Sequence, residues 1–217
     1  WALLSGLLGP VWGCAGKHRA HVHAVQISGM ADGARSRGAA GRGGALTGDG
    51  PAGVGRGVGG VDLAYSRDDG YRVGDHGPEF FAEEGADYQP VVVDVPDRNT
   101  SVVVFDEGGV KVTAFRVSHE PVDPAYGYRI DYKGRSVVFS GDTKRDANIA
   151  TFGKDADVLI HEALAAHMVG MLEEGLEHQG DRRAKVMHDI PDYHATPVQA
   201  AESANEAGAK LLVYTHI

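Results

Sequence analysis

Residues 110–143 constrain this chain most, because two strands in this stretch each end in a polar side chain. His119 follows a run of alternating apolar residues, and Asp142 follows the apolar run at residues 136–139. Residues 126–132 between them are typical of a further strand. Side chains at strand exits on the same sheet edge lie close together, and histidine and carboxylate are metal ligands, with zinc among the ions they bind. The stretch therefore predicts a β-sheet with a metal site at its edge.

Taken alone, His119 or Asp142 is more simply explained as a loop residue whose polar atoms are hydrogen-bonded. The same pattern, however, recurs later in the chain. Residues 157–162 form a short apolar strand that ends in His161 and Glu162. Residues 211–216 form a final strand that ends in His216. The recurrence favours a functional edge over unrelated loop residues.

Two histidines near the start extend the pattern. His21 and His23 are separated by one residue. On an extended segment such residues point to the same side, so one ion can bind both. Several separate segments therefore each deliver histidine or aspartate at one end, which is more specific than any single motif.

Helix signals place a further histidine. Thr196 is followed by a proline and by Gln199, which is the pattern of a helix cap with a capping box. This start leaves His194 in the loop just before the helix, and the simplest interpretation of it is a turn residue. Two more helices are predicted, over residues 61–72 and over residues 162–177, the second with a broad apolar face.

Together these segments resemble the metallo-β-lactamase superfamily, in its ribonuclease Z, arylsulfatase and phosphodiesterase-like branch. The resemblance rests on His21-x-His23, His119, Ser140-Gly141-Asp142-Thr143, LIHEA at 159–163, HAT at 194–196 and YTH at 214–216. It implies an α/β fold, a four-layer αββα metallo-β-lactamase sandwich, here incomplete at both ends. It also divides the chain into a degraded or irregular part, residues 1–49, and the remainder of one domain, residues 50–217.

The resemblance also implies roles for individual residues. The implied metal ligands are His21, His23, His119, Asp142 and His216. The implied catalytic groups are His194 as a proton donor or phosphate contact, with Glu162 and His161 as supporting groups around the metal ligands. The implied enzyme is a hydrolase that uses a metal-activated water.

One motif departs from the family pattern. The family's first motif reads His-x-His-x-Asp-His, but Val25 stands where the aspartate belongs and Gln26 where the last histidine belongs. Valine cannot coordinate, and a glutamine oxygen is a poor zinc ligand beside imidazole. We therefore expect one tight Zn²⁺ site and a second, weak one, with Mn²⁺ as an alternative ion, and reduced activity.

Charge and loop length guide the expected substrate. The net charge of −9 argues against a broad basic face that binds nucleic acid. Only about twenty residues separate His119 from Asp142, where ribonuclease Z inserts an arm that grips tRNA. We expect a small-molecule ester substrate, a phosphodiester or sulfate ester first, and no nucleic acid partner. The alternatives are a catalytically impaired metal-binding relative or inactive fragment, and a ribonuclease Z-like tRNA 3′-end endonuclease.

The N-terminal sequence bears on location. Residues 1–12 are apolar but too short to span a bilayer, and no basic residue precedes them. We expect no membrane partner and a cytoplasmic protein, or an exported one if this stretch is a truncated signal peptide. The single cysteine, Cys14, excludes an intrachain disulfide. The sequence is also compatible with a homodimer.

Overall fold

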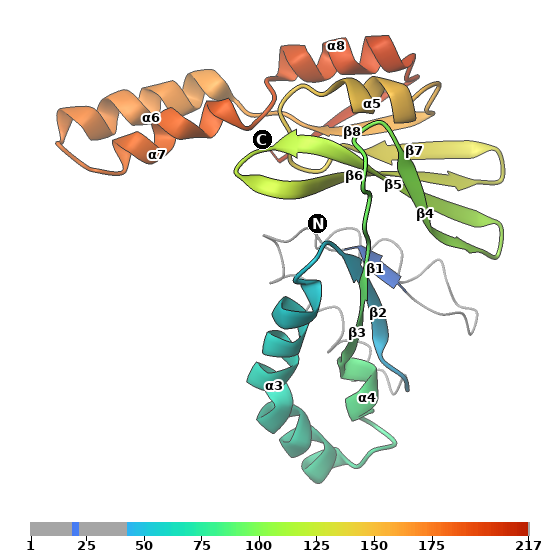
Figure 1. Ribbon diagram of the computed structural model, residues 1–217. Coiled ribbons are helices and arrows are strands. Elements are labelled where there is room, and N and C mark those ends of the chain that lie inside the picture. Colours follow the sequence, from blue (N-terminus) through green and yellow to red (C-terminus); the bar gives the residue numbers. More distant parts are fainter. Residues whose placement is uncertain (1–18, 22–42, 217) are drawn as a thin grey trace. The chain divides into compact units, whose positions relative to one another are not determined.

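The structure is a computed structural model that describes residues 19–21 and 43–216. The chain divides into two compact units, Trp1–Asp94 and Val95–Ile217 (Figure 1). The expected division into a degraded or irregular part, residues 1–49, and the remainder of one domain, residues 50–217, remains a prediction.

The first unit contains a small parallel sheet with strand order β1-β2-β3. Its described elements are β1 (Arg19–His21), β2 (Leu46–Gly50), α3 (Val54–His76), α4 (Glu83–Ala86) and β3 (Tyr88–Val92). His21 is the last residue of β1 and pairs in register with Asp49 of β2.

Helix α3 is longer than the helix predicted over residues 61–72. It begins after Gly53, whose φ of 99° ends the preceding turn, and it runs for 23 residues. Its first turns are rich in glycine, which disfavours a helix by roughly 1 kcal/mol per residue. The sequence of these turns therefore does not predict a helix. Packing compensates, because Val54 and Val58, four residues apart on one helix face, are buried.

The second unit is built on a six-stranded sheet in the order β4-β5-β6-β7-β8-β9. Its strands are β4 (Ser101–Glu107), β5 (Val110–His119), β6 (Val122–Tyr132), β7 (Arg135–Phe139), β8 (Val158–Glu162) and β9 (Leu212–Thr215). The pairs from β4 to β7 are antiparallel, whereas β7, β8 and β9 are parallel. Strands β5, β7, β8 and β9 therefore all run in one direction and end at the same sheet edge.

Some of the helices in this unit cover one face of the sheet, and others extend beyond it (Figure 1). The helical elements are α5 (Ala147–Phe152), α6 (Ala166–His178), α7 (Ala184–Asp189), the 3₁₀ turn η1 (Ile190–Asp192) and α8 (Pro197–Ala207). Helices α5 and α8 lie side by side over the sheet (Figure 1). The core between them and the strands consists of Phe115, Val117, Ala125, Val138, Ile149, Ala156, Leu159 and Ala204.

Local signals in the second unit are confirmed by the structure. The strand predicted over residues 126–132 lies within β6. The strand predicted over residues 157–162 matches β8 except for its first residue. Helix α8 begins with the predicted capping box, in which Thr196 and Gln199 bond each other's backbone N–H groups. The sequence therefore fixes the loop position of His194.

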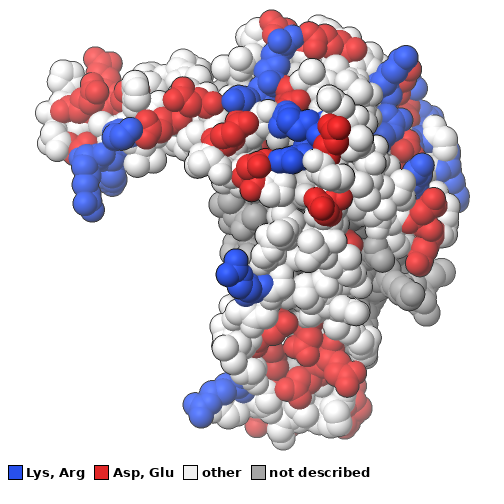
Figure 2. All heavy atoms as spheres, in the orientation of Figure 1, with Lys and Arg blue, Asp and Glu red and all other residues white. Residues whose placement is uncertain are grey.

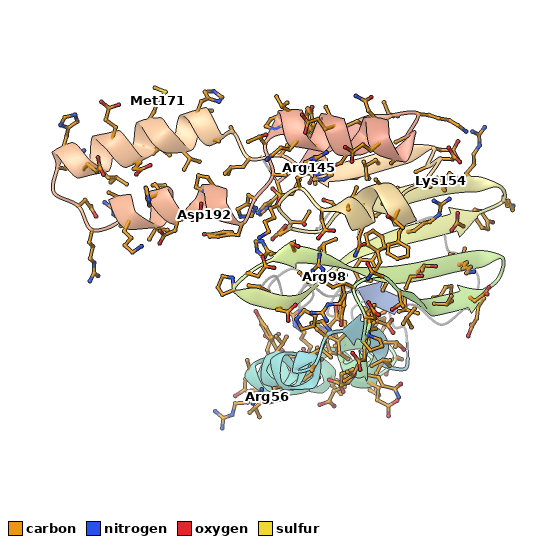
Figure 3. All side chains as sticks on the ribbon, turned by 45° about the horizontal axis from the view of Figure 1, so that its top comes forward. Arg56, Arg98, Arg145, Lys154, Met171 and Asp192 are labelled. Atoms are coloured by element: carbon orange, nitrogen blue, oxygen red, sulfur yellow. The ribbon has the colours of Figure 1, made fainter. Side chains whose placement is uncertain are left out.

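Helix α6 differs from its prediction in position and packing. It starts at Ala166 rather than residue 162, because β8 extends through Glu162. Its apolar face is exposed, with Met171 71% accessible, and Figure 3 shows Met171 pointing away from α7. Helices α6 and α7 pack on each other as a hairpin (Figure 1). No helix in the described part of the chain is long and apolar enough to span a membrane.

The turn after β7 depends on a glycine. Gly141 has a φ of +65°, and a Cβ there would lie 2.5 Å from the carbonyl oxygen of Tyr126. Gly134, in the β6–β7 turn, has a φ of +74° with nothing within 4 Å of its added Cβ. Both positions disfavour L residues by roughly 1–2 kcal/mol, but only Gly141 adds a backbone clash.

We therefore predict that Gly141→Ala lowers the free energy of unfolding more than Gly134→Ala does. The expected loss for Gly134→Ala is about 1–2 kcal/mol, since it carries the backbone term alone. Urea denaturation of both variants measures the difference. Equal losses would show that contact with Tyr126 does not hold this turn.

Candidate active site

Predicted site residues of the second unit stand at one edge of the sheet. His119 is the last residue of β5, Asp142 lies in the turn after β7, and His216 follows β9. The side chains of His119 and Asp142 are buried. Nε2 of His216 lies 3.8 Å from Oδ2 of Asp142. The parallel direction of these strands brings residues far apart in sequence to a common edge.

The ring of His119 is oriented by the loop before α8. Its Nδ1–H donates to the backbone carbonyl of Tyr193 at 2.9 Å. The two aromatic rings also meet edge to face, with centroids 5.3 Å apart. This hydrogen bond fixes the tautomer and leaves Nε2 of His119 as the nitrogen able to bind a metal.

Glu162 and His194 form a buried acid–imidazole pair. Nδ1 of His194 donates to Oε1 of Glu162 at 2.9 Å. The same oxygen accepts the backbone N–H of Thr143 at 2.6 Å. Glu162 is fully buried, and its Oε2 has no hydrogen-bond partner within the described residues. A buried carboxylate needs such donors, so this pair fixes the His194 ring.

His194 lies between the imidazoles of two predicted ligands. Its ring centroid is 5.1 Å from that of His119 and 5.4 Å from that of His216. Burial works to lower the pKa of His194, but the hydrogen bond to Glu162 and the negative charges of Glu162 and Asp142 outweigh it and raise that pKa. The ring therefore keeps a proton more readily than a free imidazole does.

His161 faces a different environment. It is fully buried, and its Nδ1 donates to the backbone carbonyl of Glu162 at 2.7 Å. Burial lowers its pKa, so the neutral form is favoured. Its Nε2 has no hydrogen-bond partner in the part of the chain that the structure covers. The supporting role expected of His161 remains a prediction.

The first motif lies largely outside the described residues. His21 ends β1 in the first unit, and its side chain is not described. His23, Val25 and Gln26 fall in residues 22–42, which the structure does not describe. The ligand roles of His21 and His23 remain predictions from the sequence.

The donor set of the second unit fits zinc in its chemistry. Imidazole and carboxylate ligands bind Zn²⁺ at about 2.0–2.2 Å, so two ligand atoms of one ion lie within roughly 4 Å of each other. The 3.8 Å separation of His216 Nε2 and Asp142 Oδ2 meets this limit. Among the described residues, no three His, Cys, Asp or Glu side chains are close enough to hold an ion together. His216 and Asp142 are therefore within ligand distance of each other, and the ring of His119 lies next to that of His194.

Sequence reasoning missed groups that orient these side chains. The Tyr193 carbonyl and the Thr143 N–H are backbone atoms, and any residue type supplies them. Ser118 and Asp146 hydrogen-bond each other beside the site, but their spacing in the sequence forms no motif. Of these groups, only Asp146 has a recognisable sequence signal, since aspartate is a favoured N-cap residue and Asp146 directly precedes α5.

Comparison with known sequences identifies the family. A family model described as a β-lactamase superfamily domain matches residues 69–217. Ribonuclease Z of Mycobacterium avium is 34% identical over 167 residues, which are 77% of this chain and 53% of that protein. A putative ribonuclease Z of Mycobacterium tuberculosis is 32% identical over 168 residues, 77% of this chain and 66% of that protein. The chain spans about half the length of the first of these relatives.

Solved structures share the fold. The metallo-β-lactamase fold protein YhfI from Bacillus subtilis aligns with a TM-score of 0.56 at 19% identity, over 99% of this chain and 70% of that chain. Human tRNase Z, short form, aligns with a TM-score of 0.55 at 22% identity, over 90% and 69%. The predicted α/β metallo-β-lactamase fold class is confirmed.

One expectation is wrong. Nucleic acid was excluded as a partner from the net charge and the short segment between His119 and Asp142, but the curated relatives are named ribonuclease Z. Net charge describes the whole chain, whereas nucleic acid contacts are local. The family match and the shared fold agree with the motifs at the sheet edge: the chain belongs to the metallo-β-lactamase superfamily of hydrolases, in its ribonuclease Z-like branch.

Proposed function

We propose that this chain is a zinc-dependent phosphodiesterase that cleaves RNA, as the name of its curated relatives states for them. The observation that carries the proposal is the buried Glu162–His194 pair beside Asp142 and His216. Phosphodiester hydrolysis needs an activated water on one side of the phosphorus and a proton for the departing oxygen on the other. The pair supplies an oriented proton donor at the sheet edge.

In this proposal some side chains bind the ion and others transfer the proton. Bound zinc lowers the pKa of a coordinated water to about 7 and polarises the phosphate oxygen. By the resemblance, Asp142 and His216 would hold a second, weaker ion, whereas Asp142 and His119 would hold the tight one, His119 through Nε2. The resemblance implies that His21 and His23 bind the same tight ion as His119. His194 donates its proton to the leaving oxygen as the P–O bond breaks, while Glu162 keeps the Nδ1–H in place.

Local cations support an anionic substrate. Lys144 and Arg145 follow Asp142 closely and are about half exposed. They pair with exposed carboxylates, Lys144 with Glu120 at 2.9 Å and Arg145 with Glu206. Exposed pairs of this kind are weak, about 0–1 kcal/mol, so a phosphate can replace the carboxylate. On the face drawn in Figure 2, the acidic and basic side chains of this unit are interspersed rather than separated.

Cleavage of a labelled precursor tRNA with a 3′ trailer, in the presence of Zn²⁺, tests the proposal. We expect cleavage that a chelator abolishes. His194→Ala should reduce the rate by about 10²–10⁴, the usual contribution of general acid–base catalysis. His178→Ala is the matched control, because this histidine of α6 is exposed and pairs with an exposed carboxylate, Glu174, at 3.8 Å. Hydrolysis of bis-p-nitrophenyl phosphate without cleavage of RNA would contradict the RNA assignment.

Metal content provides a second prediction. The resemblance implies four ligands at one position, His21, His23, His119 and Asp142, and only Asp142 and His216 at the other. We therefore expect about one tight zinc per chain. His119→Ala should empty the tight position, whereas His216→Ala should change its occupancy little. Elemental analysis after gel filtration measures both. Two equally tight zinc ions in the unmodified chain would show that the second position does not bind zinc weakly, contrary to our expectation.

The two departures from the family motif give a third prediction. The double change Val25→Asp, Gln26→His restores His-x-His-x-Asp-His. It should raise the zinc content towards two and increase phosphodiesterase turnover by about 10² or more, since metal activation and water positioning both improve. Elemental analysis and initial rates measure the two effects. A variant that binds two ions yet hydrolyses no ester would exclude the hydrolase assignment.

A further inference from the structure

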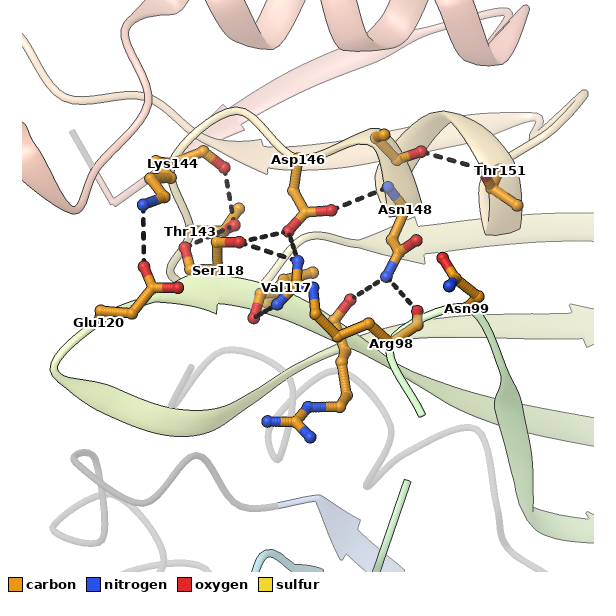
Figure 4. A network of polar contacts seen from close by, with 12 residues as sticks. Arg98, Asn99, Val117, Ser118, Glu120, Thr143, Lys144, Asp146, Asn148 and Thr151 are labelled. Carbon is orange, nitrogen blue, oxygen red and sulfur yellow. Dashed lines mark hydrogen bonds and ion pairs between the residues drawn. The ribbon is translucent and has the colours of Figure 1, made fainter. Parts of the chain in front are cut away.

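Arg98 connects two segments beside the candidate ligands. It lies between the start of the second unit and β4, and its Nη2 donates to Oγ of Ser118 at 2.9 Å. The same nitrogen pairs with the carboxylate of Asp146. Oγ of Ser118 in turn donates to Oδ2 of Asp146 at 2.7 Å, so the three side chains form a closed triangle (Figure 4).

The triangle adjoins both candidate ligands of the sheet edge. Ser118 immediately precedes His119. The Ser118 carbonyl accepts Oγ1–H of Thr143 at 3.0 Å and the backbone N–H of Lys144 at 2.9 Å. Thr143 immediately follows Asp142. The end of β5 and the turn after β7 are therefore joined next to both residues (Figure 4).

The other side of the triangle is anchored in α5. Asp146 caps this helix, with Oδ1 accepting the N–H of Asn148 at 2.9 Å. The side-chain amide of Asn148 donates to the carbonyl of Arg98 at 2.6 Å and to that of Arg116 at 2.8 Å. Arg98 is therefore held through its backbone and through its side chain.

Burial makes the guanidinium important. The side chain of Asp146 is only 5% exposed, whereas that of Arg98 is 42% exposed. A buried carboxylate that loses its cation either shifts its pKa or moves towards water. Movement of Asp146 would release Ser118, and through Ser118 the segments that bear His119 and Asp142.

We propose that Arg98 is a positioning residue for the candidate metal centre. It acts through Ser118 and Asp146 to hold His119 and Asp142 in the positions, relative to each other, that metal binding requires. The inference rests on the proposed function for its metal. Outer groups that orient ligands change metal affinity by about 10–100-fold when they are removed. The planar fork of arginine serves two acceptors at once, which a methionine cannot do.

The test measures the Zn²⁺ dissociation constant of the full chain by competition with a chelating dye. Arg98→Met removes the guanidinium. Asp146→Asn removes the negative charge but keeps a residue that caps α5 well. Arg135→Met is the matched control, because Arg135 also pairs with an aspartate, Asp157 at 3.2 Å, at the start of β7 away from the site.

A second control lies close to the site. Arg145 is one residue from Asp146 but pairs with Glu202 and Glu206 of α8, and Figure 3 shows it beside that helix. Arg145→Met therefore removes a nearby positive charge without touching the triangle. Thermal unfolding of each variant without metal records the loss of stability separately from the loss of affinity.

We expect Arg98→Met and Asp146→Asn each to weaken zinc binding by about 10–100-fold, and both controls by less than about threefold. The double variant should be no weaker than the worse single one, because both remove one interaction. Arg98→Lys should recover part of the affinity. If Arg98→Met does not fold, Asp146→Asn and Arg98→Lys decide the question.

Zinc affinity in Arg98→Met equal to that of Arg135→Met would overturn the inference, as would a chain that binds no zinc. Loss of affinity that tracks the loss of thermal stability across all variants would also overturn it, because that is a general structural role. If the chain cleaves no RNA but the affinity changes follow the expected order, the proposed function fails and the positioning role stands.

Discussion

The buried carboxylate of Glu162 is the interaction on which the candidate site depends. One oxygen accepts both the backbone N–H of Thr143 and the ring N–H of His194. It therefore joins the turn after β7 to the loop before α8, two segments about fifty residues apart in the chain. Because an unpaired buried carboxylate costs several kcal/mol, these donors must stay in place while the fold is intact. The ring of His194 and the turn that carries Asp142 are thus held by the same group.

Much of the second unit could be predicted from the sequence because its signals are local. Alternating apolar residues define β5 and β6, and the capping box of Thr196 and Gln199 starts α8 where the pattern indicates. The identity of the residues at strand exits also follows from the sequence. Convergence at one edge needs only the shared direction of β5, β7, β8 and β9.

The remainder could not be predicted because it depends on tertiary context. The glycine-rich start of α3 has poor helix propensity and is stabilised by burial of Val54 and Val58. The apolar face of α6 predicts burial, yet Met171 is exposed. Backbone donors such as the N–H of Thr143 have no sequence signature. The charge argument failed for a related reason, since a sum over the chain says little about Lys144 and Arg145 beside Asp142.

The most direct measurement is a crystal structure of the zinc-loaded chain with anomalous diffraction at the zinc edge. We predict an ion bound by Nε2 of His119 and the carboxylate of Asp142, with Nδ1 of His194 still donating to Glu162. This result would place the metal and the proton donor at the same sheet edge. A zinc ion bound elsewhere, or bound here with the Glu162–His194 hydrogen bond broken, would contradict the account.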